Sequence, residues 1–282
     1  MTTKRTSAVK HKNADTAAGR SPVMRDVPAV SKAVAILRFL ARGDSPIGVV
    51  ALAREVGAIP STCLHILRVL VNEGLAAVDP VSKKYTLGAG VLSLASTFSH
   101  RNPFVQVARS SLEDLSRKHR CAFAAIEQGD ADHMVVVAVG DVYPGVSVRL
   151  TTGTRLPILM SASGRCFAAF GKYTPADLKR RFGRLRWDNP PDFDDWLAEI
   201  AEARKHGYAI DTGHYIRGVS VVAVPVFDGQ KTILGCITTV DFREKLAGDR
   251  LKEVIADMVQ AATEAGWKLG GGTRTSRTGT SN

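Results

Sequence analysis

Residues 59–70 read IPSTCLHILRVL, and the order of side chains in this stretch decides how the N-terminal part of the chain folds. Pro60 suits the first turn of a helix, where its missing N–H costs little. The apolar residues then recur at positions i, i+3, i+4 and i+7, which is the spacing of one helix face that packs on a core. The pattern predicts a helix from about Pro60 to Asn72, ended by Gly74. Its core face consists of Cys63, Ile66, Leu67 and Leu70, which makes the cysteine a small buried hydrophobe.

The opposite face of this predicted helix is polar. It carries Ser61, His65, Arg68 and Asn72. Short hydrogen-bonding groups come first and a cation follows, an order that favours a recognition helix whose N-terminal residues meet base edges and phosphates. An ordinary solvated face is the alternative. A catalytic pair of Ser61 and His65 fits poorly, because this face has no carboxylate to orient the histidine and no evident oxyanion donor.

The segments on either side supply the other parts of a DNA-binding unit. Apolar residues at helical spacing predict a first helix over about 31–43 and a second over about 49–56. After the third helix, LAAVDPVSKKYTL (75–87) predicts two short strands around a turn at Asp79–Pro80, with two lysines near that turn. Three short helices and a basic hairpin are the parts of a winged helix-turn-helix, which we expect over residues 29–88.

The net charge of +11 is unevenly placed along the chain. Residues 1–30 hold six Lys or Arg against two acidic residues, residues 31–100 hold seven against four, and the tail from Lys268 holds three against none. Residues 101–267 are nearly balanced, with 22 bases against 21 acids. A basic N-terminal part beside a neutral body favours a polyanion as the partner at one end. A merely solvated surface is the alternative.

Length and composition set the remaining bounds. A chain of 282 residues suggests two domains of ordinary size. We expect residues 1–28 to form a disordered basic arm and residues 267–282 a flexible tail. The apolar runs are too short to span a bilayer, and the N-terminus lacks the apolar core of a signal peptide. The four cysteines form no CxxC pair, which argues against a zinc ribbon or redox motif, so we expect a cytoplasmic protein without membrane contact, metal or other cofactor.

Residues 89–119 are predicted to be a linker helix. Two apolar stripes follow one another in this segment, and Pro103 between them breaks or bends the helix. An exposed apolar stripe next to a DNA-binding unit is a candidate dimer seam. Packing of the stripe against the chain's own second domain is the alternative.

A second domain is predicted over residues 120–266. The β-rich runs that open it are CAFAAIEQG (121–129), HMVVVAVG (133–140) and VSVRLTTG (146–153). Helices are expected at about 162–171, 175–183 and 192–206. The runs YAIDT, VSVVAVPVF and TILGCITTV then predict three more strands, and apolar residues from Leu251 to Ala262 mark a final amphipathic helix. Strands, then helices, then strands again favour an α+β domain with an antiparallel sheet.

In this order the segments resemble the IclR family of bacterial transcription regulators over about residues 29–266. The resemblance rests on SKAVAILRFLA (31–41), LAREVGAIPSTCLHILRVLVNEGL (52–75) with KKYTLG (83–88), GTRLPILMSASGRCFAAF (153–170) and HGYAIDTGHYIRGVSVVAVPVFD (206–228). It implies an N-terminal winged helix-turn-helix, a linker helix and a C-terminal GAF-like effector domain. It also implies a homodimer or homotetramer that binds a promoter operator in double-stranded DNA and responds to a small-molecule effector.

The resemblance assigns DNA-binding roles to six residues. Ser61 and Thr62 match the hydroxyl residues at the start of the family's recognition helix. His65 stands where the family commonly has arginine, a departure that bears on operator preference. Arg68, Lys83 and Lys84 are expected to contact phosphate or the flanking groove, and such contacts position a protein without specifying sequence.

The resemblance also implies an effector pocket. Its residues would be Leu156, Ala162, Ser163, Asp211, Val221, Thr238 and Val240. N–H groups at a helix start, such as those near Ala162, are suited to a carboxylate. Gly213 and His214 stand where the family often has acidic residues, and Ser220 where arginine is common, so these departures bear on which ligand fits. Small organic acids and aromatic catabolites are typical effectors of the family, which contains both repressors and activators.

Two other classes of function are kept beside the regulator. An enzyme with an appended DNA-binding domain could recruit Cys166, Asp211, His214 and Asp241, but their spacings match no metal-ligand motif. The run SASG is not a nucleophile elbow, because no glycine stands two residues before Ser161. A purely structural oligomerisation module is the third possibility. We expect a regulator that is not an enzyme.

Overall fold

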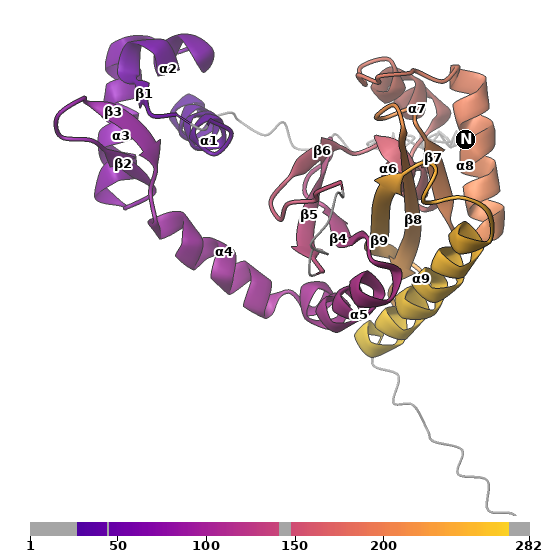
Figure 1. The fold of residues 1–282 in the computed structure, drawn as a ribbon. Helices are drawn as coiled ribbons and strands as arrows, with labels where there is room; N and C mark the ends of the chain where they lie inside the picture. The colour runs from indigo at the N-terminus through magenta and orange to yellow at the C-terminus, as the bar shows by residue number, and fades with distance from the viewer. Residues whose placement is uncertain (1–26, 44, 141–147, 271–282) are drawn as a thin grey trace, which may run out of the picture. The chain divides into compact units, whose positions relative to one another are not determined.

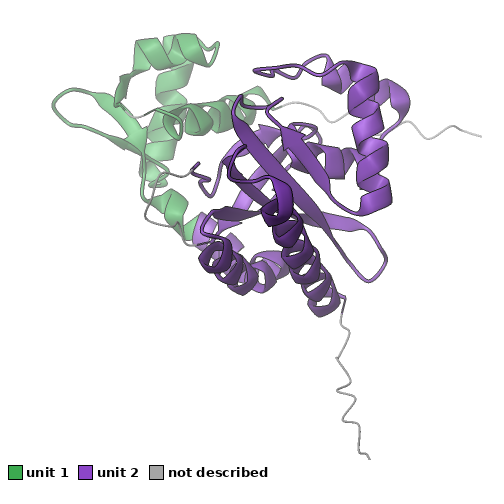
Figure 2. Cartoon of the chain, turned by 45° about the vertical axis from the view of Figure 1, so that its right-hand side comes forward, with its two compact units in different colours: residues 1–94 green, residues 95–282 purple. Residues whose placement is uncertain are grey.

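The computed structural model describes residues 27–43, 45–140 and 148–270. The chain divides into two compact units, residues 1–94 and residues 95–282 (Figure 2). The predicted basic arm lies outside the described residues except for its last two positions, and helix α1 (Pro28–Leu40) begins at the second of them. Most of the predicted tail also lies outside them.

Up to residue 88, the described part of the N-terminal unit forms three helices and a three-stranded sheet. Its further elements are β1 (Ile47–Gly48), α2 (Val49–Glu55), α3 (Pro60–Asn72), β2 (Ala76–Val78) and β3 (Lys84–Leu87). The strands pair antiparallel in the order β1-β3-β2. The sequence predicted the three helices and the hairpin, while the two-residue strand β1 is too short to carry a pattern. This unit is a winged helix-turn-helix.

One lysine fastens the helices of this unit to each other. Lys32 on α1 donates from Nζ to the backbone oxygens of Val56 and Gly57, each at 2.8 Å. These oxygens lie at and just beyond the end of α2, where backbone carbonyls have no partner within the helix. A cation at this position also suits the negative end of the helix dipole. The contact fixes α1 against the turn that leads into α3.

Two helices follow the wing, α4 (Gly90–Arg101) and α5 (Pro103–His119). Pro103 separates them as predicted, and Asn102 Oδ1 caps α5 by accepting from the N–H of Val105 at 3.0 Å. The two apolar stripes behave differently. The α5 stripe, which includes Phe104, Leu112 and Leu115, is buried against the chain's own second unit, whereas α4 buries none of its residues.

The C-terminal unit is built on a six-stranded sheet with the order β6-β5-β4-β9-β8-β7, in which every neighbouring pair is antiparallel. The strands are β4 (Ala122–Gln128), β5 (His133–Val139), β6 (Arg155–Pro157), β7 (Ala209–Thr212), β8 (Val219–Phe227) and β9 (Ile233–Phe242). The helices are α6 (Ser161–Phe170), α7 (Pro175–Phe182), α8 (Phe193–His206) and α9 (Gly248–Leu269). The fold class is therefore α+β, as predicted.

Two apolar cores lie on the two faces of this sheet. Helices α5 and α9 pack on one face, and α6 packs on the other with α8 behind it (Figure 1). Strands β8 and β9 are buried along almost their whole length, because they occupy the centre of the sheet with helices on both sides. This arrangement places the start of α6 directly against the sheet.

Two of the predicted elements differ in the structure. The run VSVRLTTG was expected to be a strand; its first two residues lie outside the described part of the chain, and the rest form no strand. Strand β6 follows it instead, after a turn at Gly153, which has a φ of +88°. Helix α9 continues to Leu269, three residues into the predicted tail. Just before the tail begins, Gly266 packs tightly against Phe227.

Within the described residues, no single helix is long and apolar enough to cross a membrane. Helices α2 and α3 meet the length and composition criteria only when taken together, and they are bent by 105° at the turn between them.

Candidate DNA-binding surface and ligand pocket

Helix α3 presents the predicted polar residues to solvent. Ser61, Thr62, His65 and Arg68 are exposed, while Cys63, Leu67 and Leu70 are buried. Burial raises the pKa of the Cys63 thiol. The helix start has no side-chain cap and no acidic residue in its first turn. Its first N–H groups therefore have no partner within the helix, and the positive end of its dipole is open to an anion.

The wing is a tight turn that carries the two predicted lysines. Asp79 Oδ1 accepts from the N–H of Ser82 at 2.5 Å and of Val81 at 3.1 Å. These bonds, that of Ser82 first, lower the pKa of the Asp79 carboxyl. Lys83 lies at the turn with a left-handed φ of +54°, and it is exposed together with Lys84. The turn thus holds two cations at the tip of the β2–β3 hairpin.

The C-terminal unit contains a cavity of about 130 Å³ between the sheet and the start of α6. The residues that line it are Ile126, Met134, Val136, Val148, Arg149, Leu150, Thr151, Thr154, Leu156, Ser161, Ser163, Tyr215, Ile216, Val221, Thr238 and Val240. Five of the seven predicted effector residues are among them. Ala162 and Asp211 are buried but do not line the cavity.

The start of α6 forms one wall of this cavity. Ser161 has a φ of +61°, which is uncommon for a residue with a side chain, and it is buried. Its Oγ has no hydrogen-bond partner among the described residues. The helix start also lacks a side-chain cap. An unpartnered hydroxyl beside free N–H groups at a helix start can receive the polar or anionic end of a ligand.

The tight approach of α6 to the preceding chain depends on Gly164. A Cβ atom built there would lie 2.0 Å from the carbonyl carbon of Leu159 and 2.4 Å from its oxygen. Only glycine fits this position without a shift of the backbone. The residue therefore sets how closely the first turn of α6 lies against the segment that leads into it.

The rest of the lining is mostly apolar with hydroxyl groups. Strands β4 and β5 contribute Ile126, Met134 and Val136, and Arg149 is the one charged side chain among the lining residues that the structure describes. Sequence reasoning missed these residues, although the inward positions of two predicted strands could have indicated the first three. Tyr215 and Ile216 gave no such signal, because they lie in a loop.

The residues considered for an enzyme are dispersed. Cys166 donates from Sγ to the oxygen of Ala223 at 3.4 Å, and Asp241 accepts from the N–H of Phe242. Only Asp211 and His214 share a partner, which is Arg165.

One group in the described part of the chain has metal-ligating side chains close together. It consists of His119, Glu253 and Asp257 between α5 and α9. Lys118 already contacts both carboxylates, at 2.6 Å from Asp257 Oδ2 and 3.3 Å from Glu253 Oε1. The lysine ammonium thus supplies the positive charge that this pair of carboxylates attracts.

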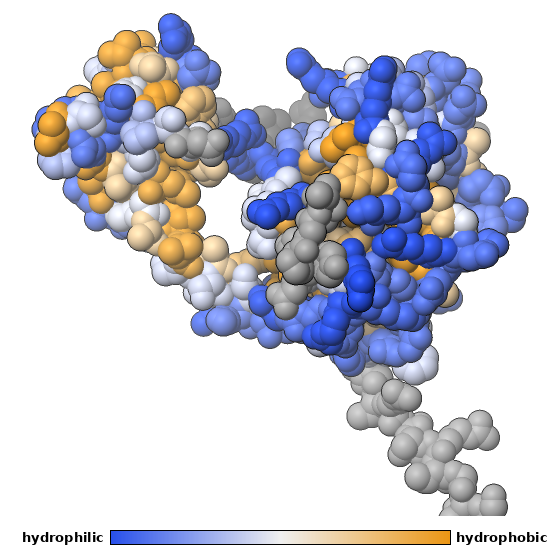
Figure 3. Space-filling model, in the orientation of Figure 1, coloured by the Kyte–Doolittle hydropathy of each residue, from blue (hydrophilic) through white to orange (hydrophobic). Residues whose placement is uncertain are grey.

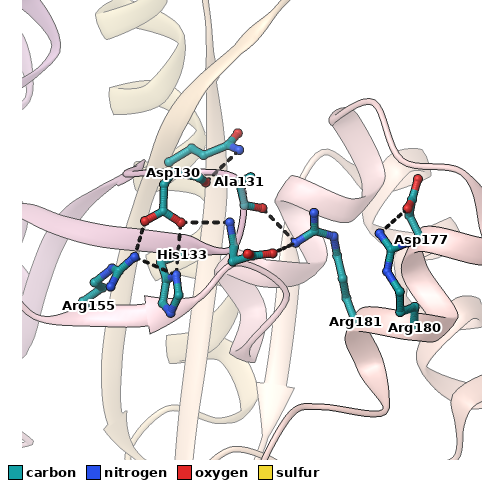
Figure 4. Close-up of polar contacts among 9 residues, drawn as sticks. Asp130, Ala131, His133, Arg155, Asp177, Arg180 and Arg181 are labelled. Carbon is teal, nitrogen blue, oxygen red and sulfur yellow. Dashed lines mark hydrogen bonds and ion pairs between the residues drawn. The ribbon is translucent and has the colours of Figure 1, made fainter. Parts of the chain in front are cut away.

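An ion-pair cluster holds β6 and α7 to the β4–β5 turn (Figure 4). Asp130 accepts from the N–H of Asp132 and contacts Arg155 and His133. Partial burial raises the pKa of Asp130, but these contacts outweigh it and hold that pKa well below its usual value. Arg181 of α7 donates to the oxygen of Ala131 at 2.8 Å. Within the cluster, Arg155 anchors β6, from which Leu156 reaches the cavity. Arg181 anchors α7 and makes no hydrogen bond to β6 among the described residues.

Comparison with known proteins agrees with this architecture. The bacterial transcriptional regulator IclR C-terminal family matches residues 97–267, and the IclR helix-turn-helix domain matches residues 29–80. A glycerol operon regulatory protein from Streptomyces coelicolor is 26% identical over 255 residues, covering 88% of this chain and 98% of that protein.

Solved structures share the fold. The structure of an IclR transcriptional regulator from Alicyclobacillus acidocaldarius has a TM-score of 0.77 at 24% identity, covering 87% of this chain and 100% of the other. An IclR homologue from Microbacterium hydrocarbonoxydans, complexed with 4-hydroxybenzoate, has a TM-score of 0.72 at 17% identity, covering 86% and 98%. Because the two family matches together span most of the chain, the protein belongs to the IclR family of bacterial transcriptional regulators, with a helix-turn-helix DNA-binding domain and an effector-binding C-terminal domain.

Proposed function

We propose that this regulator reads its operator with α3 and the wing, and that a small organic or aromatic acid bound in the cavity controls it. The observation that carries the second part is the start of α6, where the buried Ser161 hydroxyl lacks a partner beside an uncapped helix N-terminus. The residues proposed to touch DNA are Ser61, Thr62, His65, Arg68, Lys83 and Lys84. The effector contacts that we propose are Leu156, Ser161, Ser163, Val221, Thr238 and Val240.

Exposure and charge support the DNA-binding residues. Ser61, Thr62 and His65 lie on the first turns of α3, where side chains of a recognition helix meet base edges. Arg68 follows on the same exposed face, and the two wing lysines add positive charge. We infer that the hydroxyls and the histidine set sequence preference, while the cations neutralise phosphates.

The size and lining of the cavity support a small acid as effector. A volume of about 130 Å³ is below the roughly 300–1,000 Å³ of pockets for drug-sized ligands. Apolar side chains from β4 and β5 suit a hydrocarbon or ring, and the helix start suits a carboxylate. The relative that was solved with 4-hydroxybenzoate is bound to a molecule of this class. That compound is therefore a reasonable first probe.

Exposed apolar residues support a homodimer or homotetramer. Leu92, Leu94 and Phe98 of α4 are 71%, 62% and 48% exposed, and Figure 3 shows hydrophobic surface along this helix. Helix α1 adds Val30 and Val34, which are also exposed. Apolar stripes of this kind mark protein interfaces. We propose that α4 pairs with its copy in a second chain. We also propose that the protein acts in the cytoplasm.

The test of this function uses the full-length protein. A selection for bound fragments from random duplex DNA should return one palindromic sequence, and binding should weaken steeply with salt. A thermal-shift screen of small acids, starting with 4-hydroxybenzoate, should find a ligand that raises the melting temperature. Turnover of such an acid would favour the enzyme instead. Absence of any sequence preference would contradict the regulator proposed here.

A further inference from the structure

The loop after β7 forms part of the cavity wall, and its ends are sharply turned. Tyr215 and Ile216 line the cavity from this loop. Gly213 has a φ of +97° and Gly218 a φ of +75°, conformations that glycine adopts without strain. The contacts made between these two glycines therefore determine where Tyr215 lies.

The two carboxylate oxygens of Asp211 have different partners. One oxygen binds the loop, and the other binds a buried arginine. Its Oδ1 accepts from the N–H groups of Gly213, His214 and Tyr215 at 3.1, 2.9 and 3.3 Å. Its Oδ2 accepts from Arg165 Nη1 at 3.0 Å. Three N–H groups occupy both lone pairs of Oδ1, and Oδ2 is directed at Arg165, so the carboxylate is engaged by the protein itself. Asp211 is 1% exposed and does not line the cavity.

Arg165 connects this carboxylate to two other elements. Its Nε donates to Glu199 Oε2 of α8 at 2.5 Å, and its Nη2 donates to His214 Nδ1 in the loop at 3.0 Å. The guanidinium carbon also lies 5.8 Å from the ring centre of Trp187. The side chain is completely buried. Arg165 stands two residues after Ser163 on α6, so its planar guanidinium connects α6 to the loop that carries Tyr215.

The other hydrogen bonds of the loop run to residues outside α6, and one of them, from the N–H of Arg243 to the oxygen of Gly218 at 2.9 Å, is as short as those to Asp211. The N–H of Asp188 donates to the oxygen of Tyr215 at 3.4 Å, and the N–H of Asn189 donates to the oxygen of His214 at 3.1 Å. A buried ion pair adds little net stability, because desolvation offsets the attraction between the charges. Its main consequence is then geometric. The fork of Arg165 fixes the distance and angle between α6 and the loop.

We propose that Arg165 and Asp211 are positioning residues of the ligand pocket, which hold the loop of residues 213–218, and with it Tyr215, against the start of α6. They do not touch the ligand. This inference rests on the proposed function for its relevance to effector binding, but the placement of the loop can be measured without ligand or DNA.

Hydrogen exchange of the full-length protein tests the placement. Arg165→Lys keeps the charge but replaces three directed N–H groups with one ammonium, which cannot reach Asp211, Glu199 and His214 at once. We expect amides of residues 213–215 to exchange at least about ten-fold faster in this variant, while α9 and the central strands keep their protection. Asp211→Asn should have a smaller effect in the same direction, since it keeps one acceptor for the loop.

A matched control separates positioning from general loss of an ion pair. Arg181→Lys also removes arginine contacts in this unit, to Asp132 and the oxygen of Ala131, but it lies away from the loop. It should leave exchange of residues 213–215 unchanged. Should Arg165→Lys fail to fold, His214→Ala removes only the contacts of a partly exposed side chain with Arg165 and Glu199, and should still speed exchange in the loop.

The phenol of Tyr215 gives a second readout. Partial burial, with a smaller effect of Asp188, raises the pKa of Tyr215 above its usual value of about 10. Ultraviolet titration of a protein with and without Tyr215→Phe isolates the titration of this phenol. In Arg165→Lys, we expect the pKa of Tyr215 to fall toward its usual value. Loss of stability in a protein that is still folded would not move it.

The inference would be overturned if folded Arg165→Lys showed unchanged loop exchange and an unchanged Tyr215 titration. A uniform rise in exchange across the unit would overturn it as well. Binding of 4-hydroxybenzoate, measured by calorimetry, should be at least about five-fold weaker in Arg165→Lys and unchanged in Arg181→Lys. A wild-type protein that binds no acid would count against the proposed effector class, and the exchange data would still decide the positioning role.

Discussion

Ser163 and Thr238 face each other in the cavity wall, with 2.8 Å between their hydroxyl oxygens. Both side chains are buried, and the contact joins α6 to β9. One hydroxyl donates to the other, so the proton of the accepting hydroxyl remains free for a second bond. The pair thus connects the helix to the sheet and can still offer a donor to a ligand.

Removal of one member of this pair should lower the free energy of unfolding nearly as much as removal of both. Ser163→Ala leaves Thr238 Oγ1 buried without its partner, and we expect the free energy of unfolding to fall by about 1–3 kcal/mol. Adding Thr238→Val should cause little further loss, which a double-mutant cycle in urea would measure. Ser110→Ala, an exposed position on α5, is the control. Strict additivity of the two changes would show that the hydroxyls do not interact.

Gly164→Ala should destabilise the C-terminal unit strongly, although it adds only one methyl group. The added Cβ would overlap the backbone of Leu159, which cannot move aside as a flexible side chain can. We expect a loss of about 1–3 kcal/mol or more in urea unfolding. Gly183→Ala is the matched control, because the nearest atom to its Cβ would be 3.7 Å away and its φ is −64°. Equal stabilities of the two variants would contradict the close approach.

The sequence could predict α3 to the residue because local signals agree there. Pro60 opens the helix, Gly74 follows its end, and the apolar spacing assigns Cys63 to the core. Five of the seven effector residues drawn from the family resemblance line the cavity.

The features that the sequence did not predict have physical reasons. The contact that occupies Asp211 comes from Arg165, 46 residues earlier in the chain, and no local pattern reports such a pairing. Tyr215 likewise reaches the cavity from a loop, where side chains have no periodic direction. Strand β6 begins only after the predicted run, beyond the turn at Gly153.

The stability that the contact between α5 and α9 contributes should decrease at acid pH. Partial burial raises the pKa of Asp257, but hydrogen bonds from Lys118 and His119 outweigh it and lower that pKa below the usual value. A carboxyl with a lowered folded-state pKa contributes stability that is fully present above its unfolded pKa of about 3.9, and that is lost as the pH falls through the folded value.

We therefore expect Asp257→Asn to reduce stability at pH 7 by up to about 1 kcal/mol, since the group is partly exposed. The difference from the wild type should shrink as the pH falls below about 4. Urea unfolding across this range is the measurement. Asp114→Asn, which removes an exposed ion pair on α5, serves as control. A difference that grows toward acid pH would contradict the lowered pKa of Asp257.

Arg68→Ala should weaken operator binding broadly rather than change its sequence preference. If Arg68 neutralises one phosphate, its loss should flatten the plot of log affinity against log salt by about one unit. His65→Ala should instead alter which bases are preferred. Arg109→Ala removes an exposed cation on α5 and is the control for net charge. Sharply altered base preference in Arg68→Ala would assign that side chain to base edges.

Effector and operator should influence each other's affinity by the same factor. A ligand in the cavity lies in one compact unit and α3 in the other, and α4 runs through the boundary between them. The effector can change DNA affinity only if it binds one arrangement of the proposed dimer more tightly than another. We expect a coupling of about 1–3 kcal/mol, or roughly 5–150-fold in operator affinity.

Calorimetric titration of the acid found in the thermal-shift screen, with and without operator DNA, measures this coupling from the ligand side. The ratio of the two effector affinities must equal the ratio of operator affinities with and without effector, because the four equilibria form a closed cycle. Leu94→Glu places a charge on the exposed stripe of α4, where we propose that two chains pair. It should abolish the coupling together with dimer formation, while the monomer still binds effector. Equal effector affinities for the free and the DNA-bound wild type would show that the cavity does not act on DNA affinity, and control of transcription would then have to arise after operator binding.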